Sequence, residues 1–192
     1  MSNPEATDAK AFRELSGTQW CSRYPTRTDI ESLEQGFKAN LISFLGALRS
    51  AGADVVITAT LRPIERAYLM HYAWNISRKL IGADAVPAQP GVSINWVHDS
   101  SQGSIDAADA MVKEYAMVAE ASLTSNHLTG RAVDMILSWT DTLAIKDATG
   151  NLTAITSQPR DGTNPNLALI GANYKVFHEL SFDPPHWSYN GH

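Results

Sequence analysis

Apolar side chains recur at three- and four-residue intervals over residues 30–50, which predicts an amphipathic helix. Thr28 and Glu31 have the spacing of a capping box, and Ala51-Gly52-Ala53 ends the periodic stretch. The apolar positions are Ile30, Leu33, Phe37, Leu41, Phe44, Leu45 and Leu48. One face of this helix should therefore pack against the core.

Three more helices are expected further along the chain. Residues 64–80 follow Pro63, which suits the first turn of a helix because its missing N–H costs little there. Residues 105–119 follow Ser104, a residue type that caps helices. A short helix starts at Asn164-Pro165 and ends at Gly171.

Runs of β-branched and apolar residues predict strands mainly in the second half of the chain. The expected strands are residues 54–60, 132–139, 143–145, 152–155, 174–180 and 186–189, with a hairpin turn around Gly150-Asn151. Helices come first and strands cluster later, which favours an α+β fold over a parallel α/β sheet.

The segment of residues 82–103 is expected to be a long loop because it contains Pro87, Pro90, Gly91 and Gly103. Loops of this length in compact domains are usually functional or act as lids. Trp96 and His98 lie in it. Trp96 either caps the core or contacts a substrate, and the sequence leaves both readings open.

Length and charge narrow the class of protein. With 192 residues the chain suits a flexible leader at residues 1–20 and a single domain at 21–192. A net charge of −5 and a pI near 5.6 argue against nucleic acid as a partner. Cys21 is the only cysteine, so no internal disulfide is possible, and we interpret it as an incidental thiol.

No stretch of the sequence has the features of a targeting or membrane segment. Residues 1–10 are polar and acidic, and no apolar run approaches the ~18 residues needed to cross a bilayer. We therefore expect a protein made in the cytoplasm without a signal peptide and not inserted in a membrane. Such a protein would reach any site of action outside the cell by release or secretion. We also expect a monomer.

The stretch of residues 125–134 carries the first candidate chemistry. His127 and Asp134 are seven residues apart, and Gly130 between them allows a turn that brings their side chains together. Asp134 stands in an apolar run, where a carboxylate is costly unless it is paired or bound to a metal. The alternatives are that Asp134 pairs with Arg131 or a lysine and that His127 is an ordinary loop residue.

A second histidine, His186, follows the rigid pair Pro184-Pro185 and precedes Trp187. Two histidines and one aspartate form a three-ligand set, which leaves a tetrahedral zinc one open position, as in catalytic sites. Asp183 stands three residues before His186 and is a candidate general base. The alternatives are that His186 only begins a terminal strand and that Asp183 is a turn residue before proline.

Arg62 follows the end of a predicted strand and is fixed by Pro63. Its guanidinium is a candidate for binding a substrate carboxylate or the oxyanion of a tetrahedral intermediate. The alternative is a surface or ion-pairing arginine.

Taken together, these motifs resemble the zinc peptidases of peptidoglycan: the D-alanyl-D-alanine carboxypeptidases and L-alanyl-D-glutamate endopeptidases that share the Hedgehog-type fold. The pattern Ser-x-His-x6-Asp matches Ser125, His127 and Asp134, and the pattern acid-x-x-His-aromatic matches Asp183, His186 and Trp187. A Thr-x-x-x-Arg context matches Thr58 to Arg62. The resemblance covers roughly residues 55–187.

The resemblance implies a small, mostly antiparallel sheet flanked by helices, with one zinc ion at the sheet. His127, Asp134 and His186 would be its ligands, Asp183 the catalytic base, and Arg62 the group that stabilises the transition state. Arg62 and Trp187 would contact the substrate, Ser125 would either contact the substrate or support a zinc ligand, and peptidoglycan would be the partner.

The resemblance also suggests a role in cell-wall lysis. An aspartate in place of glutamate as the base is found in phage-type members, which favours an endolysin-like L-alanyl-D-glutamate activity over a carboxypeptidase. Two alternatives remain: a non-catalytic zinc module of the same fold, with His98 as a fourth ligand, and a peptidase for D-amino-acid dipeptides outside the cell wall.

Overall fold

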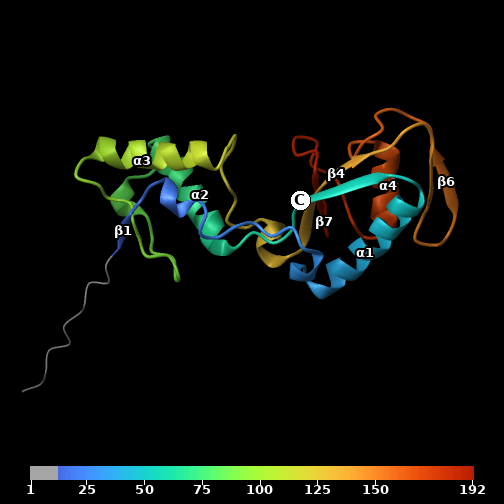
Figure 1. The fold of residues 1–192 in the computed structure, drawn as a ribbon, viewed down its shortest axis with the longest axis horizontal. Helices are drawn as coiled ribbons and strands as arrows, with labels where there is room; N and C mark the ends of the chain where they lie inside the picture. Colours follow the sequence, from blue (N-terminus) through green and yellow to red (C-terminus); the bar gives the residue numbers. More distant parts are fainter. Residues whose placement is uncertain (1–12) are drawn as a thin grey trace, which may run out of the picture. The chain divides into compact units, whose positions relative to one another are not determined.

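The structure, a computed structural model, describes residues 13–192 (Figure 1). The first 12 residues, which include most of the expected leader and the segment judged to lack a signal peptide, lie outside the described residues. The chain divides into two compact units. Unit 1 comprises residues 13–24 and Glu65–Ser122, and unit 2 comprises Pro25–Ile64 and Leu123–His192. The single domain expected after residue 20 stays a prediction.

Unit 2 is built on a three-stranded antiparallel sheet with the order β2-β4-β7. The strands are β2 (Asp54–Ala59), β4 (Ala132–Ser138) and β7 (His186–Ser188). In the β4–β7 pair, Asp134 lies directly opposite His186. The sheet thus brings together two residues that are 52 positions apart in the sequence.

The two faces of β4 differ in burial. Val133, Met135 and Leu137 are at most 2% exposed and belong to the hydrophobic core, whereas Ile136 is 58% exposed. Because side chains alternate along a strand, Asp134 lies on the face that turns away from the core. A carboxylate in this apolar run is therefore placed where a polar site can form.

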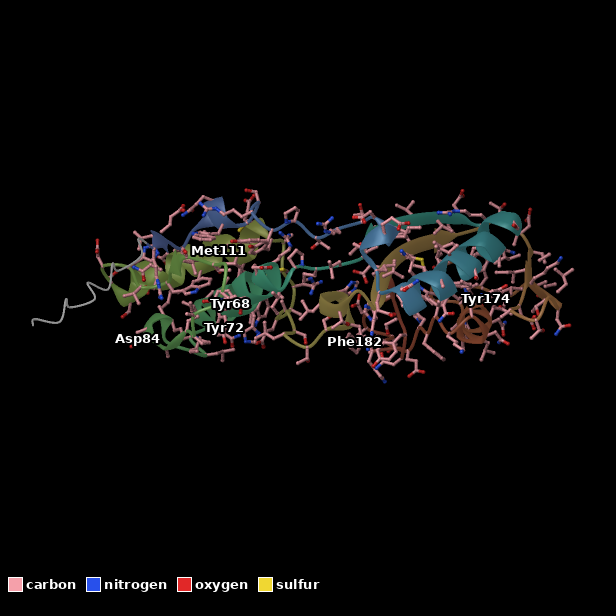
Figure 2. The ribbon with its side chains drawn as sticks, turned by 90° about the horizontal axis from the view of Figure 1, so that it is seen from below. Tyr68, Tyr72, Asp84, Met111, Tyr174 and Phe182 are labelled. Atoms are coloured by element: carbon pink, nitrogen blue, oxygen red, sulfur yellow. The ribbon has the colours of Figure 1, made fainter. Side chains whose placement is uncertain are left out.

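The core of unit 2 is completed by two helices and a hairpin. The helices are α1 (Gln35–Ser50) and α4 (Pro165–Asn173), and the hairpin consists of β5 (Leu143–Lys146) and β6 (Leu152–Ile155). Phe44 of α1 packs against Trp187 and Tyr174, with ring centroids 5.4 and 5.6 Å away. Tyr174 is labelled in Figure 2. These contacts hold β7 against the helical layer.

Unit 1 has a separate core between α2 (Ile64–Ser77) and α3 (Ser101–Glu114). A short parallel pair, β1 (Glu14–Leu15) with β3 (Ile94–Asn95), and the 3-10 helices Thr18–Trp20 and Ala83–Ala85 complete it. Tyr68 and Tyr72, labelled in Figure 2, pack with ring centroids 4.9 Å apart.

Four α-helices and small, mostly antiparallel sheets among the described residues agree with the α+β prediction. No helix in this part of the chain has both the length and the apolar character needed to cross a bilayer.

Several predicted boundaries were wrong, and local hydrogen bonds explain two of them. Asp29 caps a separate 3-10 helix, Ile30–Ser32, and α1 begins only after Glu34, whose carboxylate accepts from the N–H of Phe37. Likewise α3 begins after Ser100, whose Oγ accepts from Gly103, so Ser104 is not its cap.

Two other segments also differ from the sequence-based expectation. Residues 174–180 do not form a strand; they contribute one isolated bridge, Phe177 to Ser188. Residues 13–20, expected within a flexible leader, contain β1 and a 3-10 helix, and Trp20 is buried.

Candidate metal centre

His127 lies in a one-turn 3-10 helix, η4 (Asn126–Thr129), at the start of β4. The Oγ of Ser125 accepts from the N–H of His127 at 3.3 Å and caps this turn. Gly130 ends the turn at φ 68°, and a Cβ there would lie 2.9 Å from the backbone nitrogen of Glu34. Glycine is therefore required both by the backbone conformation and by the close approach of a neighbouring segment.

The imidazole of His127 is held by a backbone carbonyl. Its Nδ1 lies 2.6 Å from the carbonyl oxygen of Thr60, which can only accept, so Nδ1 carries the proton. Nε2, the other ring nitrogen, faces the site, and a hydrogen bond from Nδ1 to a carbonyl is the usual way proteins orient a metal-binding histidine. The N–H of Arg62 donates to the carbonyl of His127 at 3.1 Å and holds the same turn from its backbone.

The three predicted ligands converge in space. His127 Nε2 lies 3.0 Å from Asp134 Oδ1 and 3.2 Å from His186 Nδ1, and that nitrogen lies 3.3 Å from Asp134 Oδ1. Both histidines are buried and Asp134 is partly buried. Within residues 13–192, these side chains are the group of histidine and acidic residues that is arranged to hold a metal ion.

The spacing of the donor atoms fits zinc. Zn–N and Zn–O bonds of about 2.0–2.1 Å in a tetrahedron separate neighbouring ligand atoms by about 3.3–3.4 Å. The observed separations, 3.0 to 3.3 Å, are close to this value. Two imidazole nitrogens and one carboxylate oxygen are also donor types that zinc prefers.

The electrostatics of the site are consistent with a bound cation. Burial alone would raise the pKa of Asp134, but its contacts with His127 and His186 hold that pKa far below the ordinary range. Burial lowers the pKa of His186, but the hydrogen bond and charge of Asp134 outweigh it, so the pKa is raised. A carboxylate that stays ionised at this depth is suited to bind a metal ion.

Asp183 lies in the turn that leads into β7. Its backbone carbonyl accepts from the N–H of His186 at 3.0 Å, and its side chain is partly buried. The negative charge of Asp183 also contributes, as the smallest cause, to the raised pKa of His186. Phe182, labelled in Figure 2, precedes it and is 82% exposed.

The other predicted site residues have different positions. Ser125 caps the His127 turn, and Arg62 is partly buried and bonded to that turn through its backbone. Trp187 is fully buried and contacts Phe44 and His178 in the core of unit 2. This position departs from the substrate contact expected for Trp187 and gives it a structural role in fixing β7.

The remaining histidines lie outside the cluster. His98 belongs to unit 1, where its Nε2 lies 2.9 Å from Ser16 Oγ. His178 donates from Nε2 to the carbonyl of Pro184 at 2.9 Å, which steadies the Asp183 turn. His71 lies 2.9 Å from the carboxylate of Glu120.

Sequence reasoning missed the groups that support the ligands. The Thr60 carbonyl orients His127, and the Oγ1 of Thr58 donates to the carbonyl of Asp134 at 3.2 Å. The Thr60 carbonyl has no signal in the sequence because every residue carries a backbone carbonyl. Thr58 stood in the sequence only as part of the Thr-x-x-x-Arg pattern, without this supporting role.

Comparison with models of protein families and with curated proteins gave no match. Among solved structures, the chain is similar to a mutant of the vancomycin resistance D,D-pentapeptidase VanY, from the VanB-type resistance cassette, in complex with Zn(II). The TM-score is 0.39 and the identity 16%, over 91% of this chain and 85% of that chain. The centre described above therefore stands on its own geometry.

Proposed function

We propose that this protein is a zinc-dependent peptidase that hydrolyses an amide bond in the stem peptide of peptidoglycan. One observation carries the proposal: His127 Nε2, Asp134 Oδ1 and His186 Nδ1 form a triangle with sides of 3.0 to 3.3 Å. Three protein ligands leave the fourth position of a tetrahedral zinc open to substrate or water, which distinguishes catalytic from structural sites.

In this proposal each residue near the centre has a separate task. A zinc ion held there supplies Lewis acidity, which polarises a carbonyl group and acidifies water. Asp183 takes the proton of the attacking water and passes it to the leaving amine. Arg62 binds the negative charge that develops on the carbonyl oxygen or a carboxylate of the substrate. Ser125 acts indirectly, by holding the His127 turn.

The substrate assignment rests on the sequence motifs. Ser125-x-His127-x6-Asp134 and Asp183-x-x-His186 resemble those of the peptidoglycan peptidases, and an aspartate at the position of the base resembles the phage-type endopeptidases. We therefore propose L-alanyl-D-glutamate cleavage as the first activity to test and D-alanyl-D-alanine cleavage as the second. Wall lysis after release or secretion is the corresponding biological role.

The rival proposal, a non-catalytic zinc module, needs a fourth ligand from the protein. His98, the residue first considered for this task, belongs to unit 1 and bonds Ser16 there. No observation in the described part of the chain favours this rival over the peptidase.

The direct test is digestion of purified peptidoglycan, with the products identified by mass spectrometry in the presence and absence of a chelator. We expect new amino termini from stem peptides with the zinc-loaded protein and none after chelation. Asp183→Asn should lower kcat by about 10²- to 10⁴-fold, as the loss of a general base does, while zinc content is unchanged.

The matched control is Asp54→Asn, which removes an exposed carboxylate at the far end of β2 and should leave activity unchanged. Full zinc occupancy without cleavage of several wall types would favour the non-catalytic module. Equal activity of Asp183→Asn and the wild-type protein would overturn the assigned base.

A further inference from the structure

The residues that follow β7 fold back onto the turn that carries His127. Asn126, one residue before that ligand, donates from Nδ2 to the Oδ1 of Asn190 at 2.7 Å and to the backbone carbonyl of His192. These bonds link two segments that are 64 positions apart in the sequence, and the link lies beside the metal centre.

One oxygen atom of the Asn190 side chain, Oδ1, accepts most of the hydrogen bonds in this region. Asn190 Oδ1 also accepts from Ser188 Oγ at 3.3 Å and from the N–H of His192 at 3.2 Å. Ser188 Oγ lies 3.1 Å from the carbonyl of His192 as well. We call this group of Asn126, Ser188, Asn190 and the His192 backbone the C-terminal clamp.

The clamp joins the two segments that carry the histidines. Asn126 precedes His127 directly, and Ser188, which is fully buried, comes two residues after His186 on β7. The carbonyl of Asn126 also accepts from the N–H of Arg131 at 2.9 Å, so the same residue closes the turn.

These segments need such a connection. The His127 turn is not part of the sheet, and β7 is a three-residue strand at the sheet edge. Short edge strands and single turns open locally at low cost. A metal site binds tightly only when its ligands are already held at the bonding distance, because otherwise binding must also order them.

We propose that Asn126 and Asn190 are positioning residues of the metal centre, which hold His127 and His186 at the separation that a metal ion requires. This inference rests on the proposed metal centre but not on the proposed reaction or substrate. Groups that support metal ligands typically change metal affinity by 10- to 100-fold when they are removed. Because Asn190 and His192 are exposed, we expect an effect near the lower limit, about tenfold.

The test measures Co²⁺ binding to the full chain by its visible absorption, together with the melting temperature of the metal-free protein. Asn126→Ala and Asn190→Ala should each weaken Co²⁺ binding by about tenfold and change the absorption band. The double variant should lose little more than Asn126→Ala alone, since Asn126→Ala already removes both bonds from Asn126 to Asn190 and His192. The matched control is Asn173→Ala, because the bond that Asn173 Nδ2 donates, to the carbonyl of Leu169, lies within its own helix.

Two outcomes would overturn the inference. Co²⁺ affinity and spectrum of both variants could equal those of the control. Alternatively, the melting temperature of the metal-free variants could fall well below that of the control in step with affinity, which would show a general folding role. Failure of the metal centre itself gives a different result, namely no Co²⁺ binding by the wild-type protein. Failure of the proposed reaction leaves these measurements unchanged.

Discussion

The two compact units of this chain both contain histidines, but the histidines have different partners in each unit. Unit 1 contains His71 and His98, and each is paired with a nearby side chain, Glu120 or Ser16. Unit 2 brings His127 and His186 to within 3.2 Å of each other beside Asp134. Among the described residues, the group of side chains that could hold a metal ion belongs to unit 2.

The difference lies in how each histidine is supported. In unit 2 the register of β4 with β7 sets Asp134 against His186, and the Thr60 carbonyl sets the ring of His127. In unit 1 the corresponding elements are helices and two-residue strands. Donor atoms must be fixed within a few tenths of an ångström to bind a metal, and in unit 2 the β4–β7 pairing and the Thr60 carbonyl contribute to that precision.

Replacing one histidine in each unit should give the largest contrast. His127→Ala removes a ligand, so we expect zinc to be lost on dialysis and hydrolysis to fall by at least about a thousandfold, because the Lewis acid is gone. His98→Ala should keep both zinc and activity. Elemental analysis and a peptidoglycan assay measure the two effects, and comparable zinc loss in the two variants would contradict the assignment of the site to unit 2.

A tryptophan in each core provides the next test. Trp187→Ala and Trp96→Ala should each lower the free energy of unfolding by about 3–5 kcal/mol, since both side chains are buried. Only Trp187→Ala should also weaken zinc binding, because Trp187 holds the strand that carries His186. Denaturant titration and zinc competition measure the two quantities. Equal zinc affinities in both variants would show that core packing does not support the site.

Alanine substitutions at two glycines with positive φ should lower the free energy of unfolding by different amounts. Gly91→Ala, at φ 82° with its nearest neighbour the Glu65 side chain at 3.6 Å, should cost about 1–2 kcal/mol for the left-handed backbone. Gly130→Ala adds a clash with backbone atoms at 2.9 to 3.2 Å, so we expect about 2–4 kcal/mol and weaker zinc binding. A smaller loss of stability for Gly130→Ala than for Gly91→Ala would contradict the close approach at the His127 turn.

The dependence of stability on pH should be the smallest effect. Its direction differs between the metal-free and the zinc-bound protein. The raised pKa of His186 means that the protonated ring stabilises the metal-free fold below its ordinary pKa of about 6.5. That contribution is lost as pH rises through the raised value.

Zinc binding must displace the proton from His186, so apparent zinc affinity should fall by about tenfold per pH unit below the raised pKa. The rise in melting temperature caused by zinc should therefore be larger at pH 8 than at pH 6. Melting curves with and without zinc at each pH measure this rise. A rise in melting temperature that is independent of pH would contradict protonation of His186 in the metal-free state.

Much of the fold of unit 2 was predictable because local patterns agree with tertiary packing there. The apolar period of α1, the β-branched run of β2 and the β5–β6 hairpin all appear near their expected positions. The errors arose where side chains compete for a cap: Glu34 displaced the expected start of α1, and Ser100 displaced that of α3. The sequence had favoured the Thr28 capping box for the first helix and Ser104 as the cap of the third.

The composition of the candidate site was also predictable, since a carboxylate in an apolar strand and a histidine beside rigid prolines are unusual local features. Trp187 shows the limit of such reasoning. The same aromatic residue type suits a substrate contact and a buried core position, and the tertiary structure places it in the core.

By itself, the sequence determined which donor types are available and the local turns that present them: His127 before Gly130, Asp134 within β4, and His186 after two prolines. Only the tertiary structure decided that these donors meet, that the Thr60 carbonyl orients the ring of His127, and that Asn126 is hydrogen-bonded to Asn190. The physical reason is that distances between remote segments depend on strand register and packing of the whole unit, which no local window of residues contains.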